Sequence, residues 1–321
     1  MKIDVALPRI RLDRPYSVEE DIAIARTVEA TGLHAISVND HPFPVVSTDR
    51  PGHHAPDPFV ALAFLAGATT TVGLHFSLLV APYRNPFLTA RALATLSQMS
   101  KGRTVATLGT GYLREEFDAL GSSYEDRLTD EQESVQAMRL AWTGEPVHAS
   151  GNGWTAVGNS MYPRPWEDRE VSLWRGGNTL KAIRHVATNY DGWSPTGSPP
   201  GVAEQINSAP MSLETLGPKA ARLMEFWNEN DRSGRPEICW SDGDLTWLSS
   251  EDAIASRISL LSDLGVTWLK VKLSGRTTDE KIDSLHRLGK AMASAGVLDE
   301  PPALPAQTAD RPAQQAGTLA R

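Results

Sequence analysis

The chain has 321 residues, of which 40% are hydrophobic and 22% are charged, a balance typical of a globular protein with a large core. Its formal net charge of −8 argues against a nucleic-acid-binding protein, because such proteins normally present a basic face. The one cysteine, Cys239, excludes an internal disulfide and a cysteine-based metal site.

Short apolar runs alternate with longer amphipathic segments along the chain. The apolar runs predict eight strands, at residues 3–7, 34–38, 71–80, 104–108, 171–174, 191–193, 237–240 and 266–273. Helices are predicted between them, at residues 17–31, 58–69, 86–99, 129–142, 178–188, 213–228, 250–264 and 278–293. Eight strand–helix units predict an α/β fold, the (β/α)8 TIM barrel, and an open doubly wound sheet is the alternative.

Three segments interrupt this pattern. Residues 40–57 form a long loop after the second strand, and residues 143–165, rich in glycine, are predicted to be an insertion before the fifth strand, either a hairpin or a lid. Residues 299–321 hold four prolines and six alanines without apolar periodicity, so we expect a disordered tail after a barrel domain of residues 1–298. The start of the chain does not resemble a signal peptide and no apolar run could span a bilayer, so the expected compartment is the cytoplasm.

Two glycine turns follow neighbouring predicted strands, at the barrel end where active sites lie. Glycines permit close backbone approach, and the helix start after the second turn could hold a phosphate, although a plain strand-to-helix turn explains the same residues. Taken together, the turns predict one phosphate-bearing ligand lying across strands 4 and 5. The cofactor-binding candidates in these turns are Gly109, Thr110, Gly111, Gly176, Gly177, Asn178 and Thr179.

Several histidines cluster near the end of the second strand. Asp40 and His41 could form an acid–base pair or part of a metal site, and His41 could also be a hydrogen-bonding group near a redox ring or a plain loop histidine. His53 and His54 are adjacent rather than four residues apart, and no carboxylate lies at helical spacing from them. No metal site is therefore predicted.

Charged residues near other strand ends carry weaker signals. Glu115 and Glu116 could be a catalytic acid pair, but the interpretation favoured here is a solvated helix start, since acids favour that end. Lys270, Lys272 and Arg276 on and after the eighth strand could bind an anionic substrate or face outward, and Arg276 is kept as the substrate-binding candidate.

The strand ends, in this order, resemble the luciferase-like monooxygenase family, whose members are flavin- and deazaflavin-dependent barrels. The resemblance covers about residues 1–295. It is carried by Asn39-Asp40-His41, by residues 79–86 (LVAPYRNP), by residues 92–103 (ALATLSQMSKGR), by residues 108–112 with Glu116 and Gly121, by Arg175-Gly176-Gly177-Asn178 and by Asp191-Gly192-Trp193.

The resemblance implies a TIM barrel, a phosphate-bearing flavin-type cofactor and a homodimer or higher homo-oligomer. The Asp40–His41 pair and the short turn at residues 109–112 are similar to the branch that uses coenzyme F420, in which the matching histidine lies near the deazaflavin ring. The same alignment implies a non-proline cis peptide bond between Ser77 and Leu78, against the face of the ring, and places the phosphate contacts in the two glycine turns.

The chain also departs from the sugar-phosphate dehydrogenases of that branch. Tyr112 replaces an acid, and residues 42–45 (PFPV) lack a tryptophan, which disfavours a sugar-phosphate substrate. The function predicted is hydride transfer between coenzyme F420 and an unknown small organic substrate, with His41 and Tyr112 as catalytic residues. The alternatives are an FMN-dependent monooxygenase that uses reduced flavin and O₂, and a non-enzymatic flavin-binding barrel.

Overall fold

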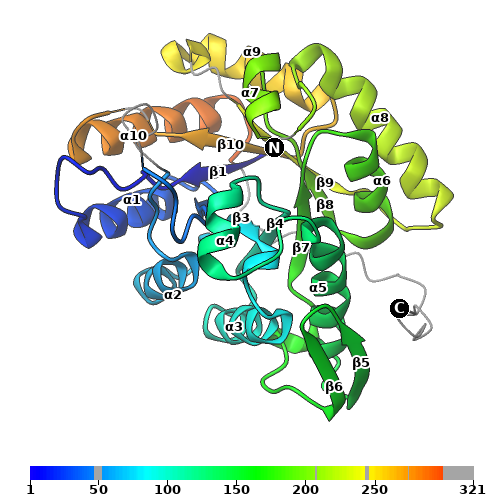
Figure 1. The fold of residues 1–321 in the computed structure, drawn as a ribbon. Helices are drawn as coiled ribbons and strands as arrows, with labels where there is room; N and C mark the ends of the chain where they lie inside the picture. Colours follow the sequence, from blue (N-terminus) through cyan, green and yellow to red (C-terminus); the bar gives the residue numbers. More distant parts are fainter. Residues whose placement is uncertain (47–52, 207, 243–245, 274, 299–321) are drawn as a thin grey trace.

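The computed structural model describes residues 1–46, 53–206, 208–242, 246–273 and 275–298; the predicted tail, residues 299–321, lies outside these ranges. In the described chain, eight parallel strands close into a barrel in the order β1-β10-β9-β8-β7-β4-β3-β2, which confirms the barrel and excludes the open sheet (Figure 1). The barrel strands are β1 (Lys2–Ala6), β2 (Ala35–Val38), β3 (Gly73–Val80), β4 (Thr104–Gly109), β7 (Ser172–Gly176), β8 (Gly192–Ser194), β9 (Glu237–Ser241) and β10 (Trp268–Lys272).

Helices surround the barrel and connect successive strands (Figure 1). Each of the eight predicted barrel helices has a counterpart; of two shorter helices, α4 begins at the helix start inferred from Glu115 and Glu116, and α7 was not predicted. The α-helices are α1 (Val18–Ala30), α2 (Pro58–Ala68), α3 (Pro86–Met99), α4 (Arg114–Leu120), α5 (Arg127–Trp142), α6 (Leu180–Asn189), α7 (Pro200–Gln205), α8 (Leu213–Glu229), α9 (Glu251–Asp263) and α10 (Thr278–Ser294). Short 3₁₀ turns are η1 (Ala81–Tyr83), η2 (Trp166–Asp168) and η3 (Thr246–Ser249).

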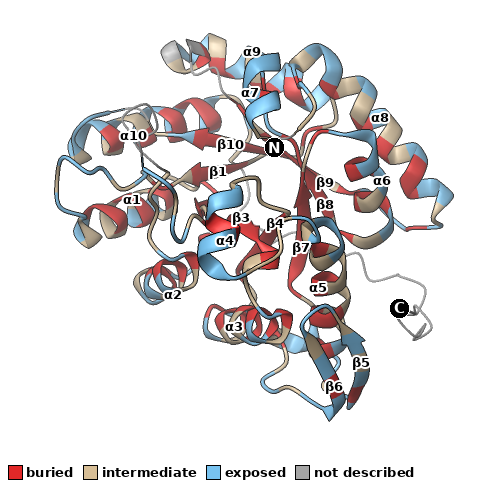
Figure 2. Cartoon of the chain, viewed as in Figure 1, coloured by how far each residue is buried: buried red, intermediate tan, exposed pale blue. Residues whose placement is uncertain are grey.

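Local sequence signals explain where the elements start. The predicted cap of α1 is confirmed, because the Ser17 hydroxyl accepts a hydrogen bond from the Glu20 amide at 3.2 Å. Pro86 occupies the first turn of α3, where its missing N–H is not needed. The barrel strands are buried while most helices have one buried and one exposed face, as Figure 2 shows, so the main core lies between barrel and helices.

The barrel interior is a filled, partly polar core. Trp174 and Trp268, from strands that are not neighbours, meet edge to face with ring centroids 5.4 Å apart. Beside them, the buried imidazole of His75 bonds Asp4 Oδ2 at 3.0 Å through Nδ1 and Thr107 Oγ1 at 2.8 Å through Nε2. Side chains therefore close the barrel below its mouth, as is usual for this fold.

The insertion before the fifth barrel strand is a hairpin rather than a lid. It consists of β5 (Val147–Gly151) and β6 (Trp154–Asn159), paired antiparallel. The ring of Trp154 packs against Phe87 at a centroid distance of 5.0 Å, and the Asn152 amide donates to Glu133 on α5 at 2.7 Å. The hairpin thus packs on the outer helices, and no described residue of it lines the pocket at the barrel mouth.

A bulge in β3 shapes the barrel mouth. The pairing of β3 with β4 shifts register between Ser77 and Leu79, and the Ser77–Leu78 peptide bond is cis, as the resemblance implied. The Leu78 side chain extends over the two glycine turns: a Cβ on Gly109 would lie 2.6 Å from Leu78 Cδ1, and one on Gly176 would lie 3.1 Å from Cδ2. A larger residue at position 109 would therefore have to displace the Leu78 side chain from this place.

None of the helices in the described ranges combines the length and the hydropathy that a bilayer crossing requires.

Candidate active site

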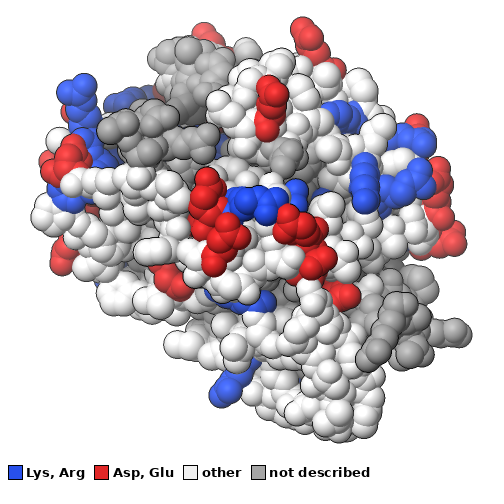
Figure 3. Space-filling view, viewed as in Figure 1, with Lys and Arg blue, Asp and Glu red and all other residues white. Residues whose placement is uncertain are grey.

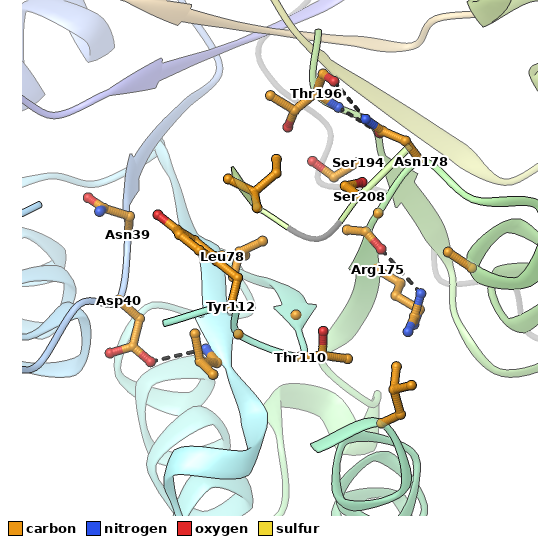
Figure 4. A pocket seen from close by; sticks show the side chains of 18 of the residues that line it. Asn39, Asp40, Leu78, Thr110, Tyr112, Arg175, Asn178, Ser194, Thr196 and Ser208 are labelled. Atoms are coloured by element: carbon orange, nitrogen blue, oxygen red, sulfur yellow. Dashed lines mark hydrogen bonds between the residues drawn. The ribbon is translucent and has the colours of Figure 1, made fainter. Parts of the chain in front are cut away.

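A cavity of about 250 Å³ opens at the carboxyl ends of the barrel strands (Figure 4). Asn39, Asp40 and Leu78 border one side of it in that view, and Asn178, Thr196 and Ser208 border the other. The lining residues are Asn39, Asp40, His41, Leu78, Val80, Tyr83, Gly109, Thr110, Gly111, Tyr112, Leu128, Arg175, Gly176, Gly177, Asn178, Thr179, Ala182, Ser194, Thr196, Ile206 and Ser208.

Hydrogen bonds to Asp40 connect the end of β2 to the end of β3. Its buried carboxylate accepts two hydrogen bonds from the Arg84 guanidinium, at 2.6 and 2.9 Å, and one from the Val80 amide at 3.0 Å. A bidentate arginine–carboxylate pair fixes both groups strongly. Although Asp40 lines the cavity, these contacts make it a residue that shapes the rim next to His41.

His41 is oriented by Glu116 of α4. The imidazole Nδ1 lies 3.0 Å from Glu116 Oε2, the same oxygen accepts from the Tyr83 hydroxyl at 3.1 Å, and Oε1 accepts from the Phe43 amide at 3.2 Å. Glu116 is fully buried, so the favoured interpretation of a solvated helix start was wrong for this residue, and only its exposed neighbour Glu115 fits it. Within the described chain, Nε2 of His41 has no protein hydrogen-bond partner.

Burial and hydrogen bonding compete in setting the charge of Glu116. Burial favours the neutral acid, but the hydrogen bond and charge of His41, with the Tyr83 and Phe43 bonds, outweigh burial and lower the pKa of Glu116 below its usual 4.5. Burial, followed by the Glu116 charge, raises the pKa of Tyr83, whose hydroxyl therefore stays protonated. A carboxylate that accepts from Nδ1 holds the proton on that nitrogen and leaves Nε2 as the acceptor nitrogen of His41, which lines the cavity.

Tyr112 has a second histidine partner. Its hydroxyl lies 3.2 Å from Nδ1 of His53, in the loop after β2, and both rings pack edge to face against His41 at centroid distances of 5.9 and 5.1 Å. Burial, followed by the charges of Arg9 and His41, lowers the pKa of His53 to about 4, so this imidazole is neutral near pH 7. Two hydrogen-bonded pairs, His41–Glu116 and Tyr112–His53, thus lie side by side at the rim.

The opposite rim is held by Asn178. Its amide nitrogen donates to the carbonyls of Thr196 and Ala209, both at 3.0 Å, and its oxygen accepts from the Thr196 amide at 3.3 Å. Thr179 caps α6 by accepting from the Ala182 amide at 3.1 Å. The side chains of Asn178 and Thr179 are thus engaged in holding the fold, which leaves the backbone amides of the helix start and, among the described lining residues, hydroxyls such as that of Ser208 for contacts to a ligand.

The cavity fits a planar apolar ring with an anionic tail. Leu78 supplies an apolar floor, and Gly177, at φ +105°, leaves the backbone of the α6 start open, where a Cβ would lie 3.2 Å from that of Ala182. Arg175 is buried beside this end and pairs with Glu131 at 3.1 Å. Within the described residues, no group of three or more His, Cys, Asp or Glu side chains could hold a metal ion.

The structure gathers most of the predicted site residues into this one cavity. Ser77 lies directly beneath it, next to Leu78, whereas Arg276 is exposed at the start of α10 and is not among the described lining residues. Sequence reasoning assigned no role to Ile206, Ser208 or His53. His53 carried a usable signal, because a histidine in the loop after a barrel strand lies near the mouth, whereas nothing local marked the other two.

The closed eight-stranded barrel, with a cavity at the carboxyl ends of its strands, defines a (β/α)8 barrel with its candidate active site in the usual place. The family model described as luciferase-like monooxygenase matches residues 5–210, and the chain belongs to this family. It is therefore a luciferase-like oxidoreductase.

Known relatives use either of two cofactors. The F420-dependent glucose-6-phosphate dehydrogenase of Amycolatopsis mediterranei is 29% identical over 160 residues, which are 49% of this chain and 47% of that protein. An F420-dependent secondary alcohol dehydrogenase, solved with an F420–acetone adduct, has a TM-score of 0.72 at 17% identity and covers 90% of this chain and 98% of its own. The FMN-bound oxygenating constituent of a Pseudomonas putida diketocamphane monooxygenase scores 0.72 at 16% identity, covering 92% and 98%. At these identities the two structures show the common fold.

Proposed function

We propose that this protein transfers a hydride between coenzyme F420 and a small organic substrate, with His41 as the polar catalytic group. The observation that carries the proposal is the His41–Glu116 pair, 3.0 Å apart, with His41 lining a cavity whose floor is Leu78. The deazaflavin, when bound, supplies the redox chemistry.

The chain's own residues position the substrate and handle its proton. When the substrate is oxidised, His41 Nε2 accepts the proton of the substrate hydroxyl as the hydride leaves, and Glu116 stabilises the imidazolium that forms. When the substrate is reduced, the Tyr112 hydroxyl, which is hydrogen-bonded to His53, donates the proton to the substrate oxygen. Leu78 and Val80 keep water from the face on which the hydride moves.

The charge of the phosphate end favours F420 over FMN. Arg175 is the arginine among the described lining residues, and Glu131 pairs with it. The ammonium of Lys219, which donates to the Asn178 carbonyl at 2.9 Å, is a further cation near this end. A phosphodiester such as that of F420 carries one negative charge, which one cation and the amides of a helix start can hold. The phosphate monoester of FMN carries close to two negative charges and calls for a second cation. Reduced FMN with O₂ remains the second candidate because the FMN-bound barrel described above has the same fold.

Binding titrations test the choice of cofactor. We expect F420 to bind in the micromolar range or tighter, and FMN to bind at least about tenfold more weakly, since one uncompensated charge at this site is worth about 1.4 kcal/mol. Fluorescence quenching of each cofactor measures both affinities. Tighter binding of FMN, together with oxygen consumption, would assign the monooxygenase; cofactor binding without turnover over a panel of alcohols, aldehydes and ketones would assign a non-enzymatic barrel.

We propose that the protein acts in the cytoplasm. Besides its small-molecule substrate, we propose that it binds a second copy of the chain to form a homodimer. The homodimer is supported by the surface of α2, which has no charged residue although it lies on the outside next to α3. Val60 and Phe64 of α2 and Leu88 of α3 are 70%, 52% and 67% exposed, and the surface over α3 and the hairpin is largely uncharged in Figure 3. We expect light scattering to give twice the chain mass, and Phe64→Glu to give a monomer; a wild-type monomer would refute the proposal.

A further inference from the structure

Lys270 reaches across the barrel beneath the candidate site. It lies on β10, and its ammonium donates to the carbonyl oxygen and to the hydroxyl of Ser77 on β3, both at 2.8 Å. Strands β1 and β2 stand between β10 and β3 in the sheet, so the side chain spans the interior rather than a neighbouring pair. The acceptor carbonyl belongs to the peptide unit that leads into Leu78, the floor of the cavity.

The surroundings of Lys270 are polar but compensate its charge only in part. Asp4, its register partner on β1, has one carboxylate oxygen bonded to His75, while the other has no hydrogen-bond partner in the described chain. Burial lowers the pKa of Lys270, Asp4 and then Cys239 oppose that effect, and Lys272 and Arg9 add to it. Among the described residues, the carboxylate that offsets the charge of Lys270 is therefore that of Asp4, which is already shared with an imidazole.

The two hydrogen bonds to the Ser77 carbonyl and hydroxyl oxygens do not by themselves require a charged donor. A neutral glutamine amide could donate to the same oxygens, without the free-energy cost of taking an ammonium group out of water. The ammonium adds a positive potential at the cavity floor, where few water molecules screen it. That potential acts on whatever charge the ring above the floor carries.

We propose that Lys270 is a positioning residue that fixes the pocket floor and whose charge makes the site bind the reduced, anionic form of a flavin-type ring more tightly than the oxidised form. The inference rests on the proposed function, because it requires a redox ring over Leu78. Reduction of such a ring concentrates negative charge on its pyrimidine end near neutral pH, whereas in the oxidised form that end carries little or only delocalised charge. Nothing in this inference depends on which substrate the enzyme accepts.

The test compares affinities for the two redox forms of one cofactor. Dissociation constants are measured anaerobically for oxidised and reduced F420, and likewise for FMN, with wild type, Lys270→Met and Lys270→Arg. In Lys270→Met we expect the reduced form to lose about tenfold more affinity than the oxidised form, because the variant removes one positive charge from beneath the cavity floor. Lys270→Arg keeps the charge, so it should keep the wild-type ratio.

A matched control removes a lysine charge at the opposite end of the barrel. Lys2→Met, at the start of β1, should leave the ratio of the two affinities unchanged. An equal loss for both redox forms in Lys270→Met, or no loss, overturns the electrostatic role while leaving the proposed function standing. Failure of the wild type to bind either cofactor in either form overturns both, and thermal unfolding of each variant confirms that it is folded.

Discussion

Replacing His41 with alanine should lower turnover by about 10²- to 10⁴-fold, the range for removal of a positioned acid–base group. Binding of the cofactor should change only a few-fold, because the glycine turns and the α6 start that hold it stay intact. The measurement is steady-state oxidation or reduction of F420 with a substrate that the wild type accepts from the panel of alcohols, aldehydes and ketones.

The control for this variant is His148→Ala, which removes an exposed histidine from the hairpin, away from the cavity. It should behave as wild type in turnover and binding. If His41→Ala keeps wild-type turnover, His41 has no part in the mechanism, and the Tyr112–His53 pair becomes the remaining acid–base group.

Glu116→Gln should lower the free energy of unfolding by about 2 kcal/mol at pH 7. The amide cannot accept the Tyr83, His41 and Phe43 hydrogen bonds with both of its heavy atoms, so buried donors lose an acceptor. Turnover should fall as well, since the tautomer and direction of the imidazole are no longer fixed. Denaturant unfolding and steady-state kinetics measure the two effects.

The effect of Glu116→Gln should also depend on pH in a defined direction. In the folded protein the pKa of Glu116 is lowered below its usual 4.5, so the carboxylate stabilises the fold fully above about pH 4.5 and progressively less as pH falls through the folded pKa. The stability difference between wild type and variant should therefore be constant near neutral pH and shrink on acidification below about pH 4.5.

Glu115→Gln is the matched control, because this neighbouring residue is exposed. It should leave stability, its pH dependence and turnover within error of wild type. A Glu116→Gln variant that is as stable and as active as the Glu115→Gln control would show that the buried contacts of Glu116 contribute nothing.

Strand ends were predicted well because their signals are local. The eight apolar runs, the Ser17 cap and the glycine turns each depend on a few consecutive residues, and the family resemblance placed the Ser77–Leu78 bond. The same local reasoning failed for Glu116. Two consecutive acids at a helix start look solvated in sequence, and only the fold shows that one of them points inward.

The sequence by itself determined the order of strands and helices and which residues lie at the barrel mouth, because apolar periodicity and turn residues act over short stretches of chain. Only the tertiary structure decided which of those residues meet. His41 and Glu116 are 75 positions apart, and Lys270 and Ser77 are 193 apart. Barrel closure brings β2, β3 and β4 side by side and turns β10 to face them across the interior, and such pairings leave no periodic trace in the sequence.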